Sequence, residues 1–213
     1  ILRAIRFETQ LGFNIEPKLL QAIKDLKDSI PTSGSERVRN EFIQILLSEQ
    51  PSQGIRRLLE LGLLERLIPE LIPTIGFDTR SSYHDKDVFE HTLVVLDNTE
   101  PNLTLRLAAL LHDIDKPNCL TIDEDGEGHC YGHASSSSEI ARTILGRLNF
   151  DRKTVKAVTA LIKEHMNDFV NISDLSIKRL IRRVGLDNID RLFELQLADI
   201  KGSELSGRDP DRT

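Results

Sequence analysis

The sequence predicts an all-α protein in which two helical sections follow one another, with one small β-hairpin inserted in the second. Apolar residues recur every three to four positions along most of the 213 residues, which is the period of an amphipathic helix. Prolines and glycines stand at the ends of these periodic stretches, where they start and stop helices. Within the second section, only residues 115–132 interrupt the helical pattern.

The first section, residues 1–75, is expected to be a series of short helices. Its first amphipathic stretch stops at Gly12, a residue suited to a helix C-cap. Pro17 opens a second helix, Ser35 is the expected N-cap of a third, and Pro51 starts a fourth.

Residues 72–86 have no clear period and are interpreted as the junction between the sections. In residues 115–132, two short runs flank the segment Asp-Glu-Asp-Gly-Glu-Gly, which predicts a hairpin with a glycine-rich tip. The polar residues from Gly202 onward are expected to be a frayed tail. The helices of the second section are predicted near residues 87–98, 104–114, 134–148, 151–166, 173–184 and 187–201.

The composition is typical of a soluble globular protein, with 39% hydrophobic and 29% charged residues. No apolar run could span a bilayer and no signal peptide is evident, so we expect a cytoplasmic protein without a membrane partner. Cys119 and Cys130 could face each other across the hairpin, but a reducing compartment favours free thiols. The net charge of −6 falls entirely within residues 76–213, which disfavours generic nucleic-acid affinity there.

Six His and Asp residues in or beside the predicted helices are candidate ligands of a divalent metal. A single histidine would more often be a packed or surface residue. Several polar side chains next to apolar helix faces are costly to bury unless they share a partner, and a metal ion would satisfy them together. Such ligands admit magnesium, manganese, iron, cobalt, nickel or zinc. The six residues are His91, His112, Asp113, His133, His165 and Asp199.

Residues 110–117, Leu-Leu-His-Asp-Ile-Asp-Lys-Pro, place a His-Asp pair at the end of an apolar helix. This run, and the order of the six candidates along the chain, resembles the HD phosphohydrolase superfamily. The resemblance implies metal-assisted hydrolysis of phosphoesters, with Asp113 and Lys116 as catalytic residues. Lys116 or Arg142 would hold the phosphate, although Lys116 could instead cap a helix C-terminus.

The same resemblance implies how the ligands are shared between one or two divalent metal ions. One ion would be held by His91, His112, Asp113 and Asp199. In members with two ions, His133 and His165 would hold the second, and Asp113 would bridge the pair.

One position departs from the superfamily, which usually has Gly where this chain has Asp115. Gly suits a helix end with positive φ, which Asp tolerates less well. Asp115 either reshapes the loop harmlessly or adds a carboxylate near the metal. His84 and His129 are expected to face solvent, and the acidic hairpin tip lacks the ligand spacing of a calcium loop.

Residues 1–7, Ile-Leu-Arg-Ala-Ile-Arg-Phe, and residues 35–41, Ser-Glu-Arg-Val-Arg-Asn-Glu, closely resemble the neck of bacterial class II tRNA nucleotidyltransferases and poly(A) polymerases. In that family an HD domain often follows the neck, and a nucleotidyltransferase head precedes it. The resemblance implies a neck at 1–75, an HD domain at 76–205 and a tail at 206–213. Because the chain begins just after a motif of the head, it is expected to be a fragment that does not itself transfer nucleotides.

Basic residues of both sections are candidate contacts for RNA phosphate. Surface ion pairs are the alternative for the arginines of the neck, which are Arg3, Arg6, Arg37 and Arg39. The strongest basic cluster is Lys178, Arg179, Arg182 and Arg183.

The predicted function is that of a phosphohydrolase in a tRNA-processing protein, acting on 2′,3′-cyclic nucleotides or RNA 3′ ends. The alternatives are a non-catalytic module for tRNA binding or dimerisation, and a purely structural metal site. Expected partners are tRNA or a nucleotide phosphoester, the nucleotidyltransferase head, and a second copy of the chain in a homodimer.

Overall fold

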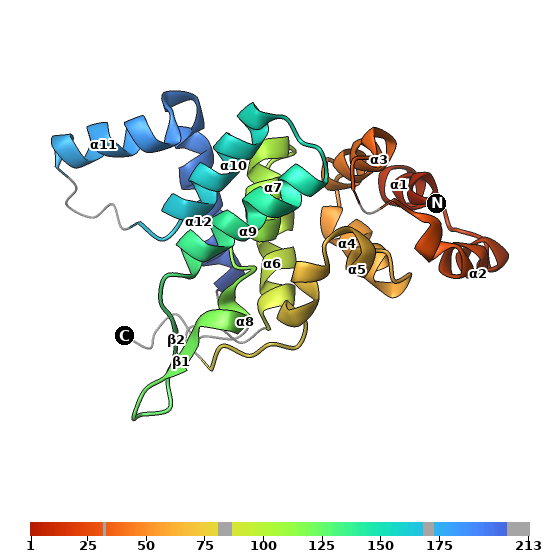
Figure 1. Ribbon diagram of the computed structural model, residues 1–213, viewed down its shortest axis with the longest axis horizontal. Coiled ribbons are helices and arrows are strands. Elements are labelled where there is room, and N and C mark those ends of the chain that lie inside the picture. Colours follow the sequence, from red (N-terminus) through yellow and green to blue (C-terminus); the bar gives the residue numbers. More distant parts are fainter. Residues whose placement is uncertain (32, 81–86, 168–172, 204–213) are drawn as a thin grey trace.

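The computed structural model describes residues 1–31, 33–80, 87–167 and 173–203, and its regular structure is almost entirely helical (Figure 1). The all-α prediction is therefore confirmed. Within the described ranges, the sheet structure is a single two-stranded antiparallel hairpin, in which Leu120 pairs with Cys130 and Ile122 with Gly128. No helix of these ranges is long and apolar enough to cross a membrane.

Local capping explains where the helices of the first section begin and end. Gly12 adopts a left-handed φ of 66° and closes α1, and Pro17 occupies the first turn of α2. The Ser35 hydroxyl accepts a hydrogen bond from the Val38 N–H at the start of α3. The elements are α1 (Leu2–Leu11), α2 (Pro17–Asp25), η1 (Lys27–Ser29), α3 (Glu36–Leu46), α4 (Pro51–Glu60), α5 (Leu64–Leu67) and η2 (Pro69–Thr74).

The second section is a helical bundle in which α6 packs against α7 and α12, and α10 packs against α7 and α9. Figure 1 shows α11 extending outward from this bundle and the hairpin projecting from its lower end. The elements are α6 (Val88–Asp97), α7 (Leu103–Leu111), α8 (Lys116–Cys119), β1 (Leu120–Ile122), β2 (Gly128–Cys130), α9 (His133–Arg147), α10 (Arg152–Glu164), α11 (Asp174–Val184), η3 (Leu186–Asn188) and α12 (Ile189–Ser203).

Two details differ from the sequence-based expectations. The short helix α8 begins at Lys116, three residues after Asp113, within the interval predicted to be non-helical. Gly202 is not part of a frayed tail, because it lies buried in the last turn of α12. His84 lies outside the described residues, so the expectation that it faces solvent stays a prediction.

The two sections share one continuous hydrophobic core and are also joined by two arginines. Arg106 of α7 is 3% exposed and donates to the carbonyls of Leu46 and Ser48 at the end of α3. Arg147 of α9 makes two hydrogen bonds, of 2.6 and 2.7 Å, to the Glu70 carboxylate. These contacts hold the first section against the bundle. The two sections therefore do not have separate hydrophobic cores.

The hairpin is anchored where β2 passes the backbone that follows η2. Gly128 donates its N–H to the Arg80 carbonyl, and a Cβ at this position would lie 1.7 Å from the Thr79 carbonyl oxygen. Only glycine permits this approach. At the tip, the Asp123 carboxylate accepts the N–H groups of Asp125 and Glu127, so it closes the turn as an internal acceptor.

Candidate metal centre

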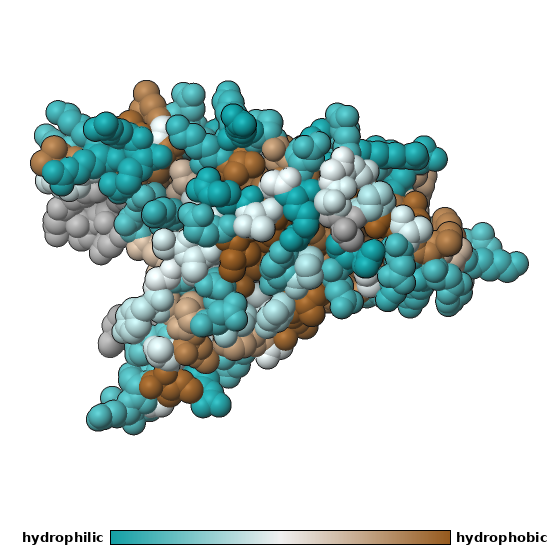
Figure 2. Space-filling view, in the orientation of Figure 1, coloured by the Kyte–Doolittle hydropathy of each residue, from teal (hydrophilic) through white to brown (hydrophobic). Residues whose placement is uncertain are grey.

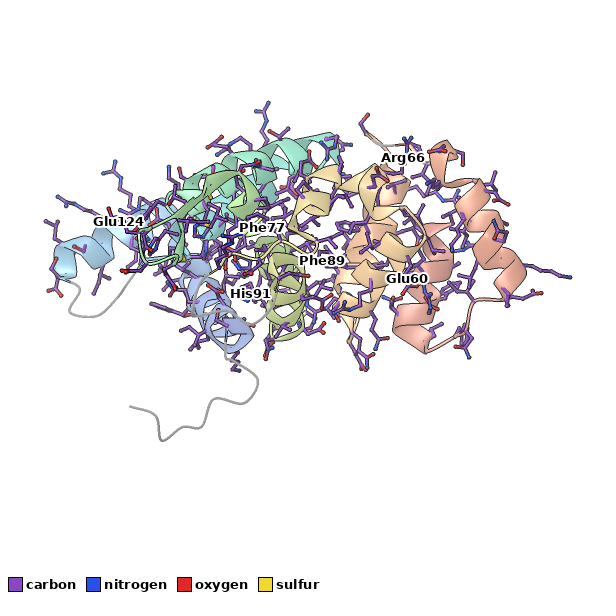
Figure 3. The ribbon with its side chains drawn as sticks, turned by 90° about the horizontal axis from the view of Figure 1, so that it is seen from below. Glu60, Arg66, Phe77, Phe89, His91 and Glu124 are labelled. Carbon is purple, nitrogen blue, oxygen red and sulfur yellow. The ribbon has the colours of Figure 1, made fainter. Side chains whose placement is uncertain are left out.

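The bundle brings the six predicted ligand residues into one buried cluster. His91 lies in the first turn of α6, where Figure 3 shows it facing the interior near α12. The His112-Asp113 pair follows the last turn of α7, His133 begins α9, and His165 follows α10. The Asp199 side chain of α12 is the most exposed of the six, at 20%, and the others are at most 8% exposed.

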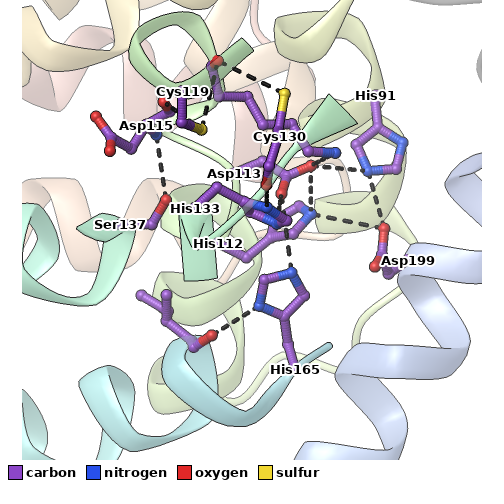
Figure 4. A network of polar contacts seen from close by, with 12 residues as sticks. His91, His112, Asp113, Asp115, Cys119, Cys130, His133, Ser137, His165 and Asp199 are labelled. Atoms are coloured by element: carbon purple, nitrogen blue, oxygen red, sulfur yellow. Dashed lines mark hydrogen bonds and ion pairs between the residues drawn. The ribbon is translucent and has the colours of Figure 1, made fainter. Parts of the chain in front are cut away.

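Four of these side chains form a first group around one carboxylate oxygen of Asp113 (Figure 4). Its Oδ2 atom lies 3.6 Å from His91 Nε2 and 3.2 Å from His112 Nε2. Asp199 Oδ1 approaches the same two nitrogens at 3.0 and 3.6 Å. Two imidazoles and two carboxylates therefore point at a common centre.

A second group forms on the opposite oxygen of the same carboxylate. Asp113 Oδ1 lies 3.2 Å from His133 Nε2 and 3.8 Å from His165 Nε2. The ligand atoms within each group lie within 4.8 Å of one another. Asp113 thus stands between the groups, with one oxygen directed into each.

Three histidines are oriented by the same local device. Each ring donates its Nδ1–H to the carbonyl of the residue three positions earlier, so its Nε2 lone pair is turned toward Asp113. His112, His133 and His165 reach the carbonyls of Ala109, Cys130 and Ile162 at 2.8, 2.6 and 2.7 Å. The backbone at each helix end therefore sets the tautomer that a metal requires.

The arrangement fits divalent metal ions better than it fits a hydrogen-bonded network. The Nε2 atoms of His112, His133 and His165 and the Oδ1 atom of Asp113 are buried without a hydrogen-bond partner among the described residues. Two ligands that each lie about 2.1 Å from one ion are roughly 3.0–3.5 Å apart. The separations of 3.0–3.6 Å in the first group match this spacing, so these residues could hold a metal.

Burial and charge act in opposite directions on the ionisable groups of the cluster. Burial lowers the pKa of His112, but the adjoining carboxylates of Asp113 and Asp199 outweigh it and raise that pKa to about 10. The same contacts hold the pKa of both carboxyl groups below their usual range despite burial. Burial, aided by the charge on His112, lowers the pKa of His165 to about 4. Near pH 7 the carboxylates are therefore ionised and His165 is neutral, whereas His112 carries a proton that a binding cation would displace.

Lys116 adds a cation to the centre. Its Nζ lies 2.6 Å from Asp113 Oδ2, and the side chain is 10% exposed. Burial lowers the pKa of Lys116, but the carboxylates of Asp113 and Asp199 raise it overall, so the ammonium stays charged. Lys116 begins α8, and its ammonium contacts Asp113. The side chain is therefore part of the cluster and does not cap the C-terminus of α7.

Asp115 does not adopt the positive φ that was expected at this position, where the superfamily usually has glycine. Its φ is −97°, an ordinary value, so the expected strain of positive φ is absent. The carboxylate accepts a hydrogen bond from Asn118 Nδ2, and the backbone N–H donates to Ser137 Oγ. Figure 4 shows the side chain pointing away from Asp113, and Asp115 belongs to neither ligand group.

Two residues that the sequence analysis did not single out hold the two groups together. Gln196 of α12 donates from Nε2 to the carbonyls of His165 and Asn167, both at 2.8 Å, and so ties α12 to the end of α10. At Gly202, a Cβ would lie 2.7 Å from Val95 Cγ2 and 3.1 Å from the His91 ring. Glycine therefore allows α12 to approach α6 closely enough for Asp199 to reach His91.

The other predicted residues lie outside the cluster. Arg142 forms an ion pair with Glu139 on α9, and His129 pairs with Asp123 on the hairpin. Neither belongs to the ligand groups formed by the described residues. Cys119 and Cys130 are free thiols, as expected.

The four arginines of the neck fall into two pairs. Arg6 pairs with Glu41 at 3.3 Å, and Arg39 contacts Glu36 and the Asn149 carbonyl. Arg3 and Arg37 are exposed and line one pocket of about 270 Å³. Internal ion pairing thus accounts for two of the four, and Arg3 and Arg37 remain open to an external anion.

A helical bundle that buries four histidines and two aspartates in one cluster is typical of helical proteins with a divalent metal site. Comparison with known sequences identifies the family. The chain belongs to the HD domain family, whose model matches residues 88–200. A second model, described as "Probable RNA and SrmB- binding site of polymerase A", matches residues 12–74. The predicted combination of a polymerase-type neck and an HD domain is confirmed.

Similar proteins include two tRNA nucleotidyltransferases and a uridylyltransferase. An "A-adding tRNA nucleotidyltransferase" from Deinococcus radiodurans is 36% identical over 92% of this chain and 47% of its own length. A "CC-adding tRNA nucleotidyltransferase" from Thermus thermophilus is 33% identical over 78% of this chain and 41% of its own length. A "Bifunctional uridylyltransferase/uridylyl-removing enzyme" from Ruegeria pomeroyi is 26% identical over 95% of this chain and 25% of its own length. The chain thus spans less than half the length of these relatives.

Proposed function

We propose that the cluster is the active site of a metal-dependent phosphohydrolase acting on phosphoesters, such as 2′,3′-cyclic nucleotides or RNA 3′ ends. The supporting observation is the Asp113 carboxylate, whose two buried oxygens face two separate groups of histidines. A closed structural site would need only one of these groups. The second group therefore favours catalysis over a purely structural role.

Each group of residues would have a distinct part in the reaction. The first ion would be held by His91, His112, Asp113 and Asp199, and a second by Asp113, His133 and His165. When bound, such ions acidify a water ligand and offset the charge that develops on a phosphoryl oxygen. Lys116, charged and beside Asp113, would hold a non-bridging phosphate oxygen. The surrounding buried side chains would keep bulk water from the reacting phosphate.

We further propose that the neck binds tRNA and that the chain is part of a cytoplasmic tRNA-processing protein, together with a nucleotidyltransferase head. The match of residues 12–74 to an RNA-binding model and the names of the relatives support this. The open pair Arg3 and Arg37 would contact RNA phosphate. The proposed boundaries are 1–75 for the neck, 76–205 for the HD domain and 206–213 for the tail, and a homodimer stays a prediction.

The test is hydrolysis of 2′,3′-cyclic AMP by the chain after chelation and reconstitution with each candidate metal. We expect metal-dependent turnover that falls at least about a hundredfold in Asp113→Asn, because a ligand of both groups loses its charge. Asp125→Asn, on the exposed hairpin tip, is the matched control and should retain full activity. Turnover that needs no metal, or that survives Asp113→Asn, would contradict the proposal. A folded protein inactive with every metal would favour the tRNA-binding alternative.

A further inference from the structure

Helix α11 carries a concentrated positive charge in a section of the chain that is otherwise acidic. Residues 76–213 account for the whole net charge of −6, yet α11 contains four cations and a single acid, Asp174, at its first position. The four cations are all exposed and occupy adjacent positions of one helical face, one turn apart in two pairs. They are Lys178, Arg179, Arg182 and Arg183.

Three of these cations have no counter-ion within the part of the chain that the structure describes. No carboxylate of those ranges forms an ion pair with Lys178, Arg179 or Arg182, whereas Arg6, Arg57 and Arg147 of the neck and bundle are paired with glutamates. Like charges on adjacent turns repel one another, so such a face is unfavourable unless an external anion compensates it. The observation points to a polyanionic partner.

The cationic face ends at a contact with the residue that precedes the candidate ligand His165. Arg183 makes a two-point contact with the Glu164 carboxylate, at 2.7 and 2.8 Å. Glu164 is the last residue of α10 and immediately precedes the ligand His165. Figure 1 shows α11 running outward from this part of the bundle, and Figure 2 shows the hydrophilic surface along it. A chain of phosphates on α11 would therefore lead toward the cluster.

The apolar residues of α11 indicate which polyanion it meets. Leu180 and Val184 are buried against the bundle, whereas Leu175 and Ile177 are exposed in the first turn, outside the cationic segment 178–183. The cationic segment itself therefore offers no fully exposed apolar side chain that could enter a lipid bilayer. The chain also contains no tryptophan. Residues 178–183 span about 7.5 Å of helix, which is roughly the length of two or three phosphates of one nucleic-acid strand.

We propose that α11 binds the phosphate backbone of single-stranded RNA and guides its 3′ end into the metal centre. This inference rests on the proposed function, which it narrows from phosphoesters in general to the ends of RNA strands. The chain would then have two RNA-binding surfaces, the neck and α11. Substrates would fall into two classes. A mononucleotide needs only the metal centre, whereas an oligonucleotide also gains the contacts of α11.

The test uses the variant Lys178→Gln/Arg179→Gln/Arg182→Gln and leaves the Arg183–Glu164 pair intact. The matched control removes three exposed cations of the neighbouring helix α10, as Arg152→Gln/Lys153→Gln/Lys156→Gln. Fluorescence anisotropy with a labelled oligoribonucleotide of about ten nucleotides gives the affinity as a function of salt. Hydrolysis is measured with 2′,3′-cyclic AMP and with the same oligonucleotide ending in a 2′,3′-cyclic phosphate.

We expect the α11 variant to bind the oligonucleotide about tenfold more weakly or worse. Its slope of log affinity against log salt should be shallower by about 2, since each contact to a single strand contributes about 0.7. Its KM for the oligonucleotide should rise while hydrolysis of 2′,3′-cyclic AMP is unchanged, and the control variant should behave like the unmodified chain.

Equal losses in both variants would show only general electrostatic attraction and would overturn the inference. So would unchanged RNA affinity in the α11 variant, including the case in which it loses binding to anionic phospholipid vesicles instead. If 2′,3′-cyclic AMP is not hydrolysed by the unmodified chain, the proposed function fails, but the anisotropy measurement still decides whether α11 binds RNA.

Discussion

Gln196 connects the two ligand groups, and its replacement should weaken one of them selectively. Gln196→Met keeps the length of the side chain but removes both hydrogen bonds to the carbonyls of His165 and Asn167. Each bond contributes about 1 kcal/mol, and partial exposure reduces the sum to roughly 1–2 kcal/mol. If this free energy positions His165, the second metal ion should bind about 5- to 30-fold more weakly.

Isothermal titration of Mn²⁺ into the metal-free chain would separate the two ions by affinity. The stronger step should be unchanged in Gln196→Met, because α12 stays packed against α6 and α7 and so keeps Asp199 beside His91 and His112. Gln10→Met removes a comparable amide contact in the neck, from Gln10 Nε2 to the Gln44 carbonyl, and serves as the control. Equal weakening of both steps, or no change in either, would refute the positioning role of Gln196.

Three further changes test other parts of the structure. Arg106→Met removes the donor to the carbonyls of Leu46, Ser48 and Thr99. The free energy of unfolding, measured in urea, should fall by about 3 kcal/mol. A loss below about 1 kcal/mol would contradict the role of Arg106 in joining the sections. Gly202→Ala should push α12 away from His91 and lower the affinity for the first metal ion, measured by the same Mn²⁺ titration. Gly146→Ala is the control: its Cβ would meet no atom within 4 Å, so the free energy of unfolding should be unchanged or slightly higher. Burial and the nearby Cys130 thiol raise the pKa of Cys119 to about 12, so its thiol stays protonated at neutral pH. Alkylation by iodoacetamide at pH 8 should therefore be at least about tenfold slower in the folded chain than in urea, and equal rates would contradict this.

Much of the fold follows from local signals in the sequence. Apolar periodicity predicts the helices of both sections, and Gly12, Pro17 and Ser35 mark helix ends as expected. The clustering of the six candidate residues could be predicted because polar residues recur beside buried helix faces, a pattern that a common partner explains. The superfamily resemblance then added the order and the pairing.

The features that were missed depend on contacts distant in sequence. Gln196 and Gly202 show nothing unusual in their own helix, and their importance comes from the approach of α12 to α10 and α6. Arg106 resembles a surface residue in sequence, because acceptors for a buried guanidinium are backbone carbonyls that no pattern reveals. The positive φ expected at Asp115 was inferred from a residue type that the superfamily prefers, whereas the short helix α8 accepts Asp at an ordinary φ.

The most direct test of the account is the position of bound metal in crystals of the chain loaded with Mn²⁺, measured by anomalous diffraction. We predict two peaks on either side of Asp113. One should lie among His91, His112 and Asp199, and the other between His133 and His165. A single peak remote from Asp113, or no anomalous signal in the cluster at saturating Mn²⁺, would contradict the central claim that one buried carboxylate joins two metal sites.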